Sequence, residues 1–222
     1  MSLFKDLKLS ASIRHAYDVP LLPIKDIVPF PGLEIPVEIS EINHVKLLET
    51  VLKDNKRLCA MICNSSVGKK YVGMVGALMR IISFSESDNG KYIVIFKSLT
   101  RCVFTDTKLS KDGFYKIDVN WNLFLDDEKI KTEKLKERKS LEKITLEYAD
   151  KYNLNKFDFN ADKLYSITDT RLMSLLVNNI ILPVNKHKLV TAAVDLNELA
   201  NIFNQHMEFK LAELEAKTAL KH

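Results

Sequence analysis

Hydrophobic runs between residues 19 and 121 predict a segment built mainly of β-strands. The run Leu58 to Cys63 is continuously apolar between polar neighbours, which is typical of a short buried strand. Similar runs occupy residues 71–84, 92–96, 101–104 and 115–121. Turn sequences at residues 87–90 and 111–113 separate pairs of these runs. The pattern predicts six or seven strands in a small mixed β-barrel.

One helix interrupts these strands in the predicted order. It runs from Glu41 to about Lys53, with Ser40 as its cap, and Val45, Leu48 and Leu52 form an apolar stripe at helical spacing. Among the later strands, Gly73 and Gly76 indicate a bend or a close approach of two backbones.

Prolines concentrate in the stretch Leu21 to Val37, which reads as two short strands around a tight corner. Proline cannot donate a hydrogen bond to a sheet, so we expect these strands at an edge, bent or bulged. At Pro31-Gly32 the proline ring fixes one φ angle and glycine permits a positive φ at the next position, which favours a type II turn.

The pattern changes to helical periodicity near Asp126. Residues 126–152 interleave Lys and Glu around Leu141, Ile144 and Tyr148, which is typical of a helix with a solvated face. The next helix is expected to begin at Thr168 or Asp169, either of which can cap it, and to end at Pro183. A shorter helix is expected over residues 186–194. Asp195-Leu196-Asn197-Glu198 has the spacing of a capping box and opens a last helix of about twenty residues. We therefore expect a leader at 1–18, a barrel at 19–124 and a helical bundle at 125–222.

Composition and charge exclude several classes of protein. Of the 222 residues 46% are hydrophobic and 28% are charged, an ordinary globular composition, and the net charge of +4 is too balanced for a nucleic-acid partner. No apolar run approaches the roughly 18 residues that span a membrane. The three cysteines, Cys59, Cys63 and Cys102, lie in apolar segments without a histidine pair, which indicates buried thiols, no metal and a reducing, cytoplasmic location.

Sequence motifs for catalysis are missing as well. The chain has no phosphate-binding Gly-rich loop and no Gly-x-Ser-x-Gly elbow, and its five histidines are scattered. The acidic run at residues 126–128 lies at an expected helix start, where carboxylates favour the helix dipole. We therefore expect no catalytic residues and no cofactor.

The opening run of residues 21–32, Leu-Leu-Pro-Ile-Lys-Asp-Ile-Val-Pro-Phe-Pro-Gly, resembles the signature of the amino-terminal, substrate-binding domain of ATP-dependent Lon proteases. Residues 72–77, 168–172 and 195–199 resemble later family segments in the same order. Two departures are Ser98, where the family has glycine, and residues 40–43, which replace a charged loop. The resemblance implies an α+β fold with a PUA-like barrel and a carboxy-terminal helical bundle, which would recognise unfolded or tagged polypeptide. The ATPase and Ser-Lys protease portions would lie beyond residue 222.

Three binding functions follow as hypotheses. Exposed apolar side chains at Phe30, Pro31, Leu33 and Ile35 could take up extended polypeptide beside an unpaired strand edge, or the same side chains could plug one end of the barrel. An RNA-binding barrel would use Lys69, Lys70, Arg80 and Lys91. An assembly or adaptor role would pair the stripe of the last helix with a second copy.

Overall fold

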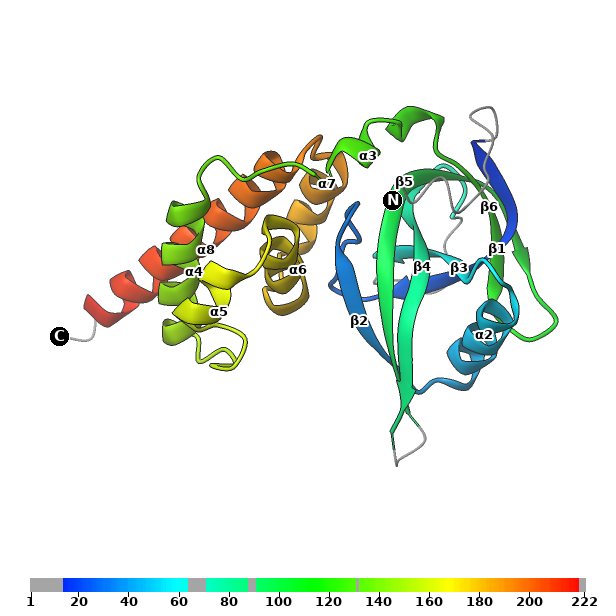
Figure 1. Cartoon of the computed structure of the whole chain (residues 1–222), viewed down its shortest axis with the longest axis horizontal. Helices are drawn as coiled ribbons and strands as arrows, with labels where there is room; N and C mark the ends of the chain where they lie inside the picture. Colours follow the sequence, from blue (N-terminus) through cyan, green and yellow to red (C-terminus); the bar gives the residue numbers. More distant parts are fainter. Residues whose placement is uncertain (1–13, 64–70, 88–90, 131, 220–222) are drawn as a thin grey trace. The chain divides into compact units, whose positions relative to one another are not determined.

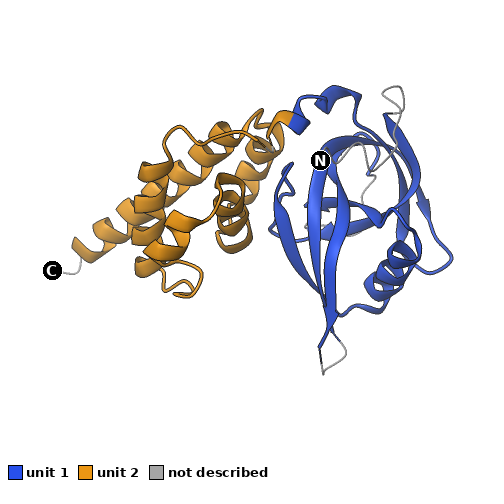
Figure 2. Cartoon of the chain, in the orientation of Figure 1, with its two compact units in different colours: residues 1–128 blue, residues 129–222 orange. Residues whose placement is uncertain are grey.

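The computed structural model describes residues 14–63, 71–87, 91–130 and 132–219. The chain divides into two compact units, residues 1–128 and residues 129–222 (Figure 2). Most of the expected leader, residues 1–13, lies outside the described residues, whereas its last residues belong to the first strand.

The first unit is a small barrel with one additional strand and one helix (Figure 1). The strands follow the order β2-β5-β4-β3-β1-β6, and β5 also pairs with β6, so that five strands close a ring outside which β2 is paired with β5 alone. Among the described strand pairs, β1 and β3 run parallel and the other pairs run antiparallel. The elements are β1 (His15–Ile24), β2 (Glu34–Ile39), α2 (Ile42–Lys53), β3 (Leu58–Cys63), β4 (Val75–Glu86), β5 (Tyr92–Leu109), β6 (Tyr115–Asn120) and η1 (Asn122–Phe124).

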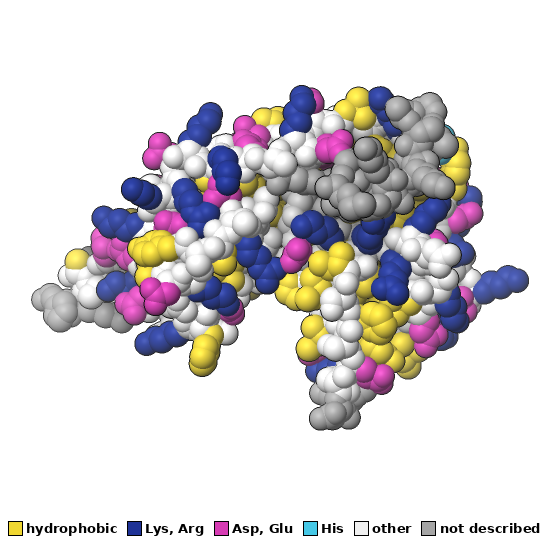
Figure 3. Space-filling model, in the orientation of Figure 1, with side chains coloured by type: hydrophobic (Ala, Val, Ile, Leu, Met, Phe, Trp, Pro, Cys, Tyr) yellow, Lys and Arg dark blue, Asp and Glu magenta, His cyan; other side chains and the backbone are white. Residues whose placement is uncertain are grey.

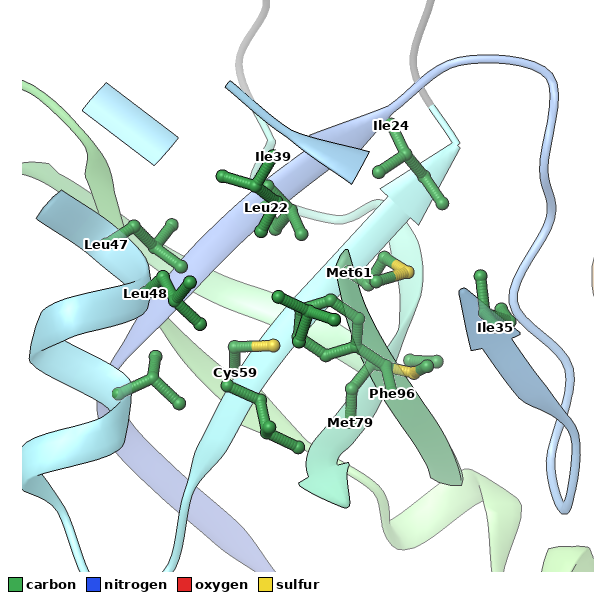
Figure 4. Packing of buried hydrophobic residues seen from close by; sticks show 14 of the residues in the cluster. Leu22, Ile24, Ile35, Ile39, Leu47, Leu48, Cys59, Met61, Met79 and Phe96 are labelled. Atoms are coloured by element: carbon green, nitrogen blue, oxygen red, sulfur yellow. The ribbon is translucent and has the colours of Figure 1, made fainter. Parts of the chain in front are cut away.

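Buried side chains of the described residues form two apolar clusters in this unit. In the first, Leu47 and Leu48 of α2 pack in one cluster with Met61, Met79 and Phe96 of the barrel strands (Figure 4). The second cluster lines other parts of the ring and contains Leu21, Ile62, Leu78, Cys102, Phe104 and Trp121. The six strands and one helix agree with the expected fold.

Gly76 marks a close approach of two strands, as the sequence indicated. A Cβ atom at this position would lie 2.3 Å from Cζ of Phe104 and 2.6 Å from the carbonyl oxygen of Met61. Gly73, in contrast, has open space around it but a φ of 83°. The two glycines are therefore needed for different reasons, one for space and one for its backbone angle.

One long strand, β5, replaces two short strands that the sequence predicted. The sequence predicted separate strands at residues 92–96 and 101–104, whereas the chain runs through as one strand of 18 residues. The polar residues Ser98 and Thr100 between these runs, and Arg101 at the start of the second run, are buried. The apolar run is interrupted at these polar residues, so the sequence pattern divided one strand into two.

The second unit is a bundle of helices. Its elements are α4 (Arg138–Lys151), α5 (Ala161–Ser166), α6 (Asp169–Asn179), α7 (Val184–Ala192) and α8 (Leu196–Ala219), and the short α3 (Asp127–Ile130) spans the boundary between the units. Thr168 caps α6 by accepting a hydrogen bond from the N–H of Arg171. Asp195 accepts from the N–H of Glu198 at 2.7 Å, so the expected cap of α8 is confirmed. The cap expected for α2 is wrong, because its N-cap is Glu41 and makes no side-chain bond.

Arg138 holds three helices of this bundle together. Its guanidinium donates to Glu142 within α4, to Asp169 at the start of α6, and to the carbonyl oxygens of Leu164 and Ile167 around the end of α5. Asp169 also accepts from the N–H of Leu135 at 2.9 Å. The charged stretch at 126–152, predicted to be a solvated face, thus contributes buried groups.

The apolar stripe of α8 lies inside this unit. Phe203, Met207 and Leu211 are buried, and α8 contacts α4, α6 and α7. The stripe is therefore used within the chain, which removes the basis for the expected pairing with a second copy. Self-association stays a prediction without a surface assigned to it.

Candidate functional site

The proline-rich corner has the predicted geometry. The N–H of Leu33 donates to the carbonyl oxygen of Phe30 at 3.3 Å, and Gly32 has a φ of 83°, as a type II turn with proline and glycine at its centre requires. The N–H of Gly32 donates to the carbonyl oxygen of Ser98 at 3.0 Å, and the N–H of Ser98 donates to that of Leu33 at 2.9 Å. The corner is therefore fixed to the middle of β5.

The four side chains expected to be exposed at this corner are buried. Phe30, Leu33 and Ile35 are each 0% exposed, and Pro31 is also buried. The expectation that they offer an accessible surface is wrong. Ile35 belongs to the core cluster that α2 covers (Figure 4), which agrees with the alternative that such side chains fill the interior.

The alternation along β2 explains this burial. Successive side chains of a strand point to opposite faces, so Leu33, Ile35 and Ile39 share one face and Glu34, Pro36 and Glu38 share the other. The first set is buried, whereas Pro36 and Glu38 are exposed. This apolar-polar alternation was readable in the sequence and would have placed Leu33 and Ile35 in the core.

The outward face of the same strands carries an accessible apolar strip. Pro36 of β2 lies opposite Ile95 of β5, and the neighbouring row joins Glu38 to Ile93. On the other side of β5, Ser83 and Ser85 of β4 lie opposite the two isoleucines. Ile93 is 46% exposed, Pro36 is exposed and Ile95 is half-buried. We call Pro36, Ile93 and Ile95 the outer strip.

Hydrophobic side chains gather over β2, β4 and β5 on the face shown in Figure 3. Ion pairs bound the outer strip at both ends: Lys97 Nζ lies 3.4 Å from Glu34 Oε1, and Lys91 Nζ lies 2.7 Å from Glu38 Oε1. An accessible apolar surface rimmed by polar groups is the usual form of a protein-binding patch. The register of β2 against β5 is what brings this patch together.

The edge of β2 is a weaker candidate than its outward side chains. β2 ends the sheet and pairs only with β5 among the described strands. However, Pro36 stands in the middle of this six-residue strand and has no N–H to donate. Short edge strands with proline and charged side chains resist pairing with another chain. Side-chain contacts on the outer strip are therefore the better basis for binding.

An arginine ties the proline-rich corner to the chain that leaves the barrel. The guanidinium of Arg101 lies 5.5 Å from the ring centre of Phe30 and 5.0 Å from that of Phe124. It donates to Asp127 Oδ1 at 2.5 Å through Nη2 and at 3.1 Å through Nε. The backbone N–H of Arg101 donates to Asp127 Oδ2 at 2.7 Å. No sequence pattern indicates this pair, because its members are 26 positions apart.

The three cysteine thiols lie in surroundings that disfavour catalysis or metal binding. Burial raises the pKa of the Cys59 and Cys102 thiols, and the negative charge of Asp127 raises that of Cys102 further. Burial, followed by the charge of Asp26, raises the pKa of Cys63 to about 11. The thiolate forms are thus disfavoured at neutral pH. Within the described part of the chain no cluster of histidine, cysteine and carboxylate side chains could hold a metal ion.

The described part of the chain brings together no basic patch from the residues proposed to contact RNA. Lys69 and Lys70 lie outside the described residues. Arg80 is half-buried on β4, and Lys91 is engaged with Glu38. None of the helices that the structure describes is long and apolar enough to cross a membrane.

Comparison with known proteins gives a consistent result over most of the chain. The family model described as "ATP-dependent protease La (LON) substrate-binding domain" matches residues 18–214. A Lon protease of Endomicrobium trichonymphae is 23% identical over 199 residues, which cover 84% of this chain and 24% of that protein. Lon protease 1 of Bdellovibrio bacteriovorus is 30% identical over 87 residues, 37% of this chain and 11% of that protein. The chain thus spans a quarter or less of the length of these relatives.

Solved structures share the fold. The N-terminal domain of Mycobacterium avium complex Lon protease aligns with a TM-score of 0.57 at 14% identity, covering 86% of this chain and 97% of that one. A Lon N-terminal domain protein from Xanthomonas campestris aligns with a TM-score of 0.51 at 15% identity, covering 85% and 96%. The expected fold, a mixed β-barrel followed by helices, is confirmed.

Proposed function

Because the chain belongs to the ATP-dependent protease La (LON) substrate-binding domain family, we propose that it recognises unfolded polypeptide as a non-catalytic module. In this proposal the chain presents bound segments to an ATPase and a protease, as its similarity to part of longer Lon proteases suggests. The outer strip on β2 and β5 is the surface that makes the contact.

The accessible isoleucines of the outer strip are the observation that carries this proposal. Unfolded chains expose aliphatic side chains that folded proteins bury, so an apolar strip favours them without reading a particular sequence. The charged groups at the rim are already paired with each other, Lys97 with Glu34 and Lys91 with Glu38. Binding should therefore depend little on salt, in contrast to an RNA-binding surface.

The test compares binding of a reduced and alkylated model protein to the wild type and to the double variant Ile93→Thr/Ile95→Thr. Threonine keeps the branched Cβ that strands favour but removes apolar surface. Losing about one buried methylene equivalent at each position costs roughly 1.5 kcal/mol of binding free energy, or about tenfold in Kd. Leu109→Thr is the matched control, because Leu109 is 66% exposed at the far end of the same strand.

Two results would contradict the assignment to the outer strip. One is unchanged affinity in the double variant with its fold intact. The other is an equal loss in Leu109→Thr, which would indicate a nonspecific effect of surface polarity. Phe30→Ala tests the role of the proline-rich corner. Phe30 is fully buried, so its truncation should lower the free energy of unfolding by about 3 kcal/mol or more.

A further inference from the structure

A second concave surface lies in the helical unit, between the start of α4 with the segment before it and the first turns of α8. It encloses about 260 Å³, and its apolar lining comes from Leu135, Leu141 and Ala200. Ser140, Asn201 and Asn204 add polar groups to its wall. We call this cavity the amide pocket. Its volume is below the roughly 300–1,000 Å³ typical of sites for drug-sized ligands.

The wall of the amide pocket is held in place by Asn197, which also lines it. The carboxamide of Asn197 donates to Glu133 Oε1 at 2.6 Å and to the carbonyl oxygen of Lys134 at 3.2 Å, and it accepts from the N–H of Lys136 at 2.8 Å. Glu133 also accepts from the N–H of Leu196 at 2.8 Å. These bonds fix the segment before α4 against α8, so the pocket is formed before any ligand arrives.

The polar groups of the pocket offer hydrogen bonds in both directions. Asn204 donates to Glu208 at 2.8 Å, and the Oδ1 of Asn201 accepts a long bond of 3.4 Å from Gln205. Within the described part of the chain, Nδ2 of Asn201, Oδ1 of Asn204 and the hydroxyl of Ser140 have no partner. The pocket thus keeps a donor, an acceptor and a hydroxyl beside an apolar lining.

We propose that the amide pocket binds the backbone of an extended polypeptide. The N–H and C=O of one residue point to the same side of an extended chain, and here the N–H would donate to Oδ1 of Asn204 while the C=O accepts from Nδ2 of Asn201. An aliphatic side chain of the ligand would lie against Leu135 and Leu141. The two asparagines are three positions apart, about 4.5 Å along the helix axis, which is comparable to the ~3.3 Å rise of an extended residue. Lys136 and Glu137, which also line the cavity, carry opposite charges, so a neutral ligand suits it.

This inference rests on the proposed function and adds a reason for its selectivity. In a folded protein nearly all backbone N–H and C=O groups are already bonded to each other. Only an unfolded or extended segment can present them to a pair of carboxamides. The amide pocket therefore selects chains by their unpaired backbone, whereas the outer strip selects them by exposed aliphatic side chains.

The experiment titrates the full chain with a short, capped, uncharged peptide of alanine and leucine, and with the same peptide N-methylated at alternate residues. The side-chain NH₂ signals of Asn201 and Asn204 in NMR spectra report the contact. Asn201→Leu should weaken binding about tenfold, as expected for losing hydrogen bonds, and N-methylation should do the same for the wild type. The variant should fold, because Asn201 is exposed on a helix and leucine favours helices more than asparagine does.

Asn185→Leu is the matched control, since Asn185 is an exposed asparagine on another helix, α7. It should bind the peptide as the wild type does. Equal affinity of Asn201→Leu and wild type, or equal binding of the N-methylated peptide, would overturn the inference.

The two proposals can fail separately. If the wild type binds unfolded model protein and only Ile93→Thr/Ile95→Thr loses it, the pocket inference falls and the proposed function stands. If the capped peptide shifts the Asn201 signal but unfolded protein is not bound, the pocket is supported and the proposed function falls.

Discussion

The buried pair of Arg101 and Asp127 should be a main determinant of the stability of the first unit. Side-chain exposure is 8% for Arg101 and 2% for Asp127. Arg101→Met keeps much of the side-chain volume but removes the three guanidinium bonds to the carboxylate, at 2.5, 3.1 and 3.2 Å. Asp127 would retain the N–H of residue 101 and the hydroxyl of Thr100 as donors. It would still be a buried charge without its counter-ion.

Breaking one side of a buried ion pair typically costs about 3–5 kcal/mol, because the remaining charge stays desolvated. We place Arg101→Met in this range, with the lost contacts of the guanidinium with the Phe30 and Phe124 rings included. For a chain of this size that free energy corresponds to a decrease in Tm of roughly 6–20 °C. Asp127→Leu alone should cost a similar amount. The double variant should recover part of the loss, since both charges are then absent.

The measurement is chemical denaturation followed by the fluorescence of Trp121. This is the only tryptophan, and it is buried in the second apolar cluster of the first unit, so its signal reports that unit alone. Lys108→Met is the control, because Lys108 pairs at 3.3 Å with Asp106 on the same strand but is well exposed, and its midpoint should match the wild type. A loss below about 1 kcal/mol in Arg101→Met would refute the reasoning.

Three further substitutions test other parts of the structure. Gly76→Ala should cost about 3 kcal/mol or prevent folding, since its Cβ would lie 2.3 Å from the ring of Phe104; a thermal melt equal to wild type would contradict the close approach. Ser98→Ala should leave the free energy of unfolding unchanged or raise it by up to about 1 kcal/mol, because the buried hydroxyl has no partner among the described residues. Burial, with Lys186 and Lys210, lowers the pKa of His206 below 6.5, so the unfolded chain binds that proton more tightly and stability falls as pH drops from about 6.5 through the folded pKa. His206→Gln should flatten this pH dependence in far-UV circular dichroism melts, and an unchanged slope would exclude His206 as its source.

Elements with a strong local signal could be predicted from the sequence. The strand at Leu58–Cys63 begins and ends where its apolar run does. Pro31-Gly32 forms its turn, and Asp195 caps its helix, because each of these depends on neighbours within a few positions. The short helix α5 was not predicted, since it has six residues and buries only Leu164.

Features that depend on distant partners could not be predicted. The middle of β5 is polar in sequence, yet Arg101 is buried there because Asp127, in a later element, neutralises it. In the same way Arg138 lies in a stretch that reads as a solvated helix, and its partner Asp169 follows 31 positions later. A single sequence shows the charge of each side chain but not the group that compensates it. The sequence pattern therefore predicted neither the continuity of β5 nor the contact between the starts of α4 and α6.

The exposed isoleucines of β5 have two possible explanations, and the chosen substitution separates them. Branched side chains stabilise strands even without a partner, so Ile93 and Ile95 could serve only the local structure of β5. Threonine has the same branching at Cβ, and it satisfies that requirement nearly as well. If strand propensity is the whole reason, Ile93→Thr/Ile95→Thr keeps both its stability and its binding of unfolded protein. If the outer strip contacts polypeptide, stability is kept and binding is lost, because only binding needs the apolar surface that threonine lacks.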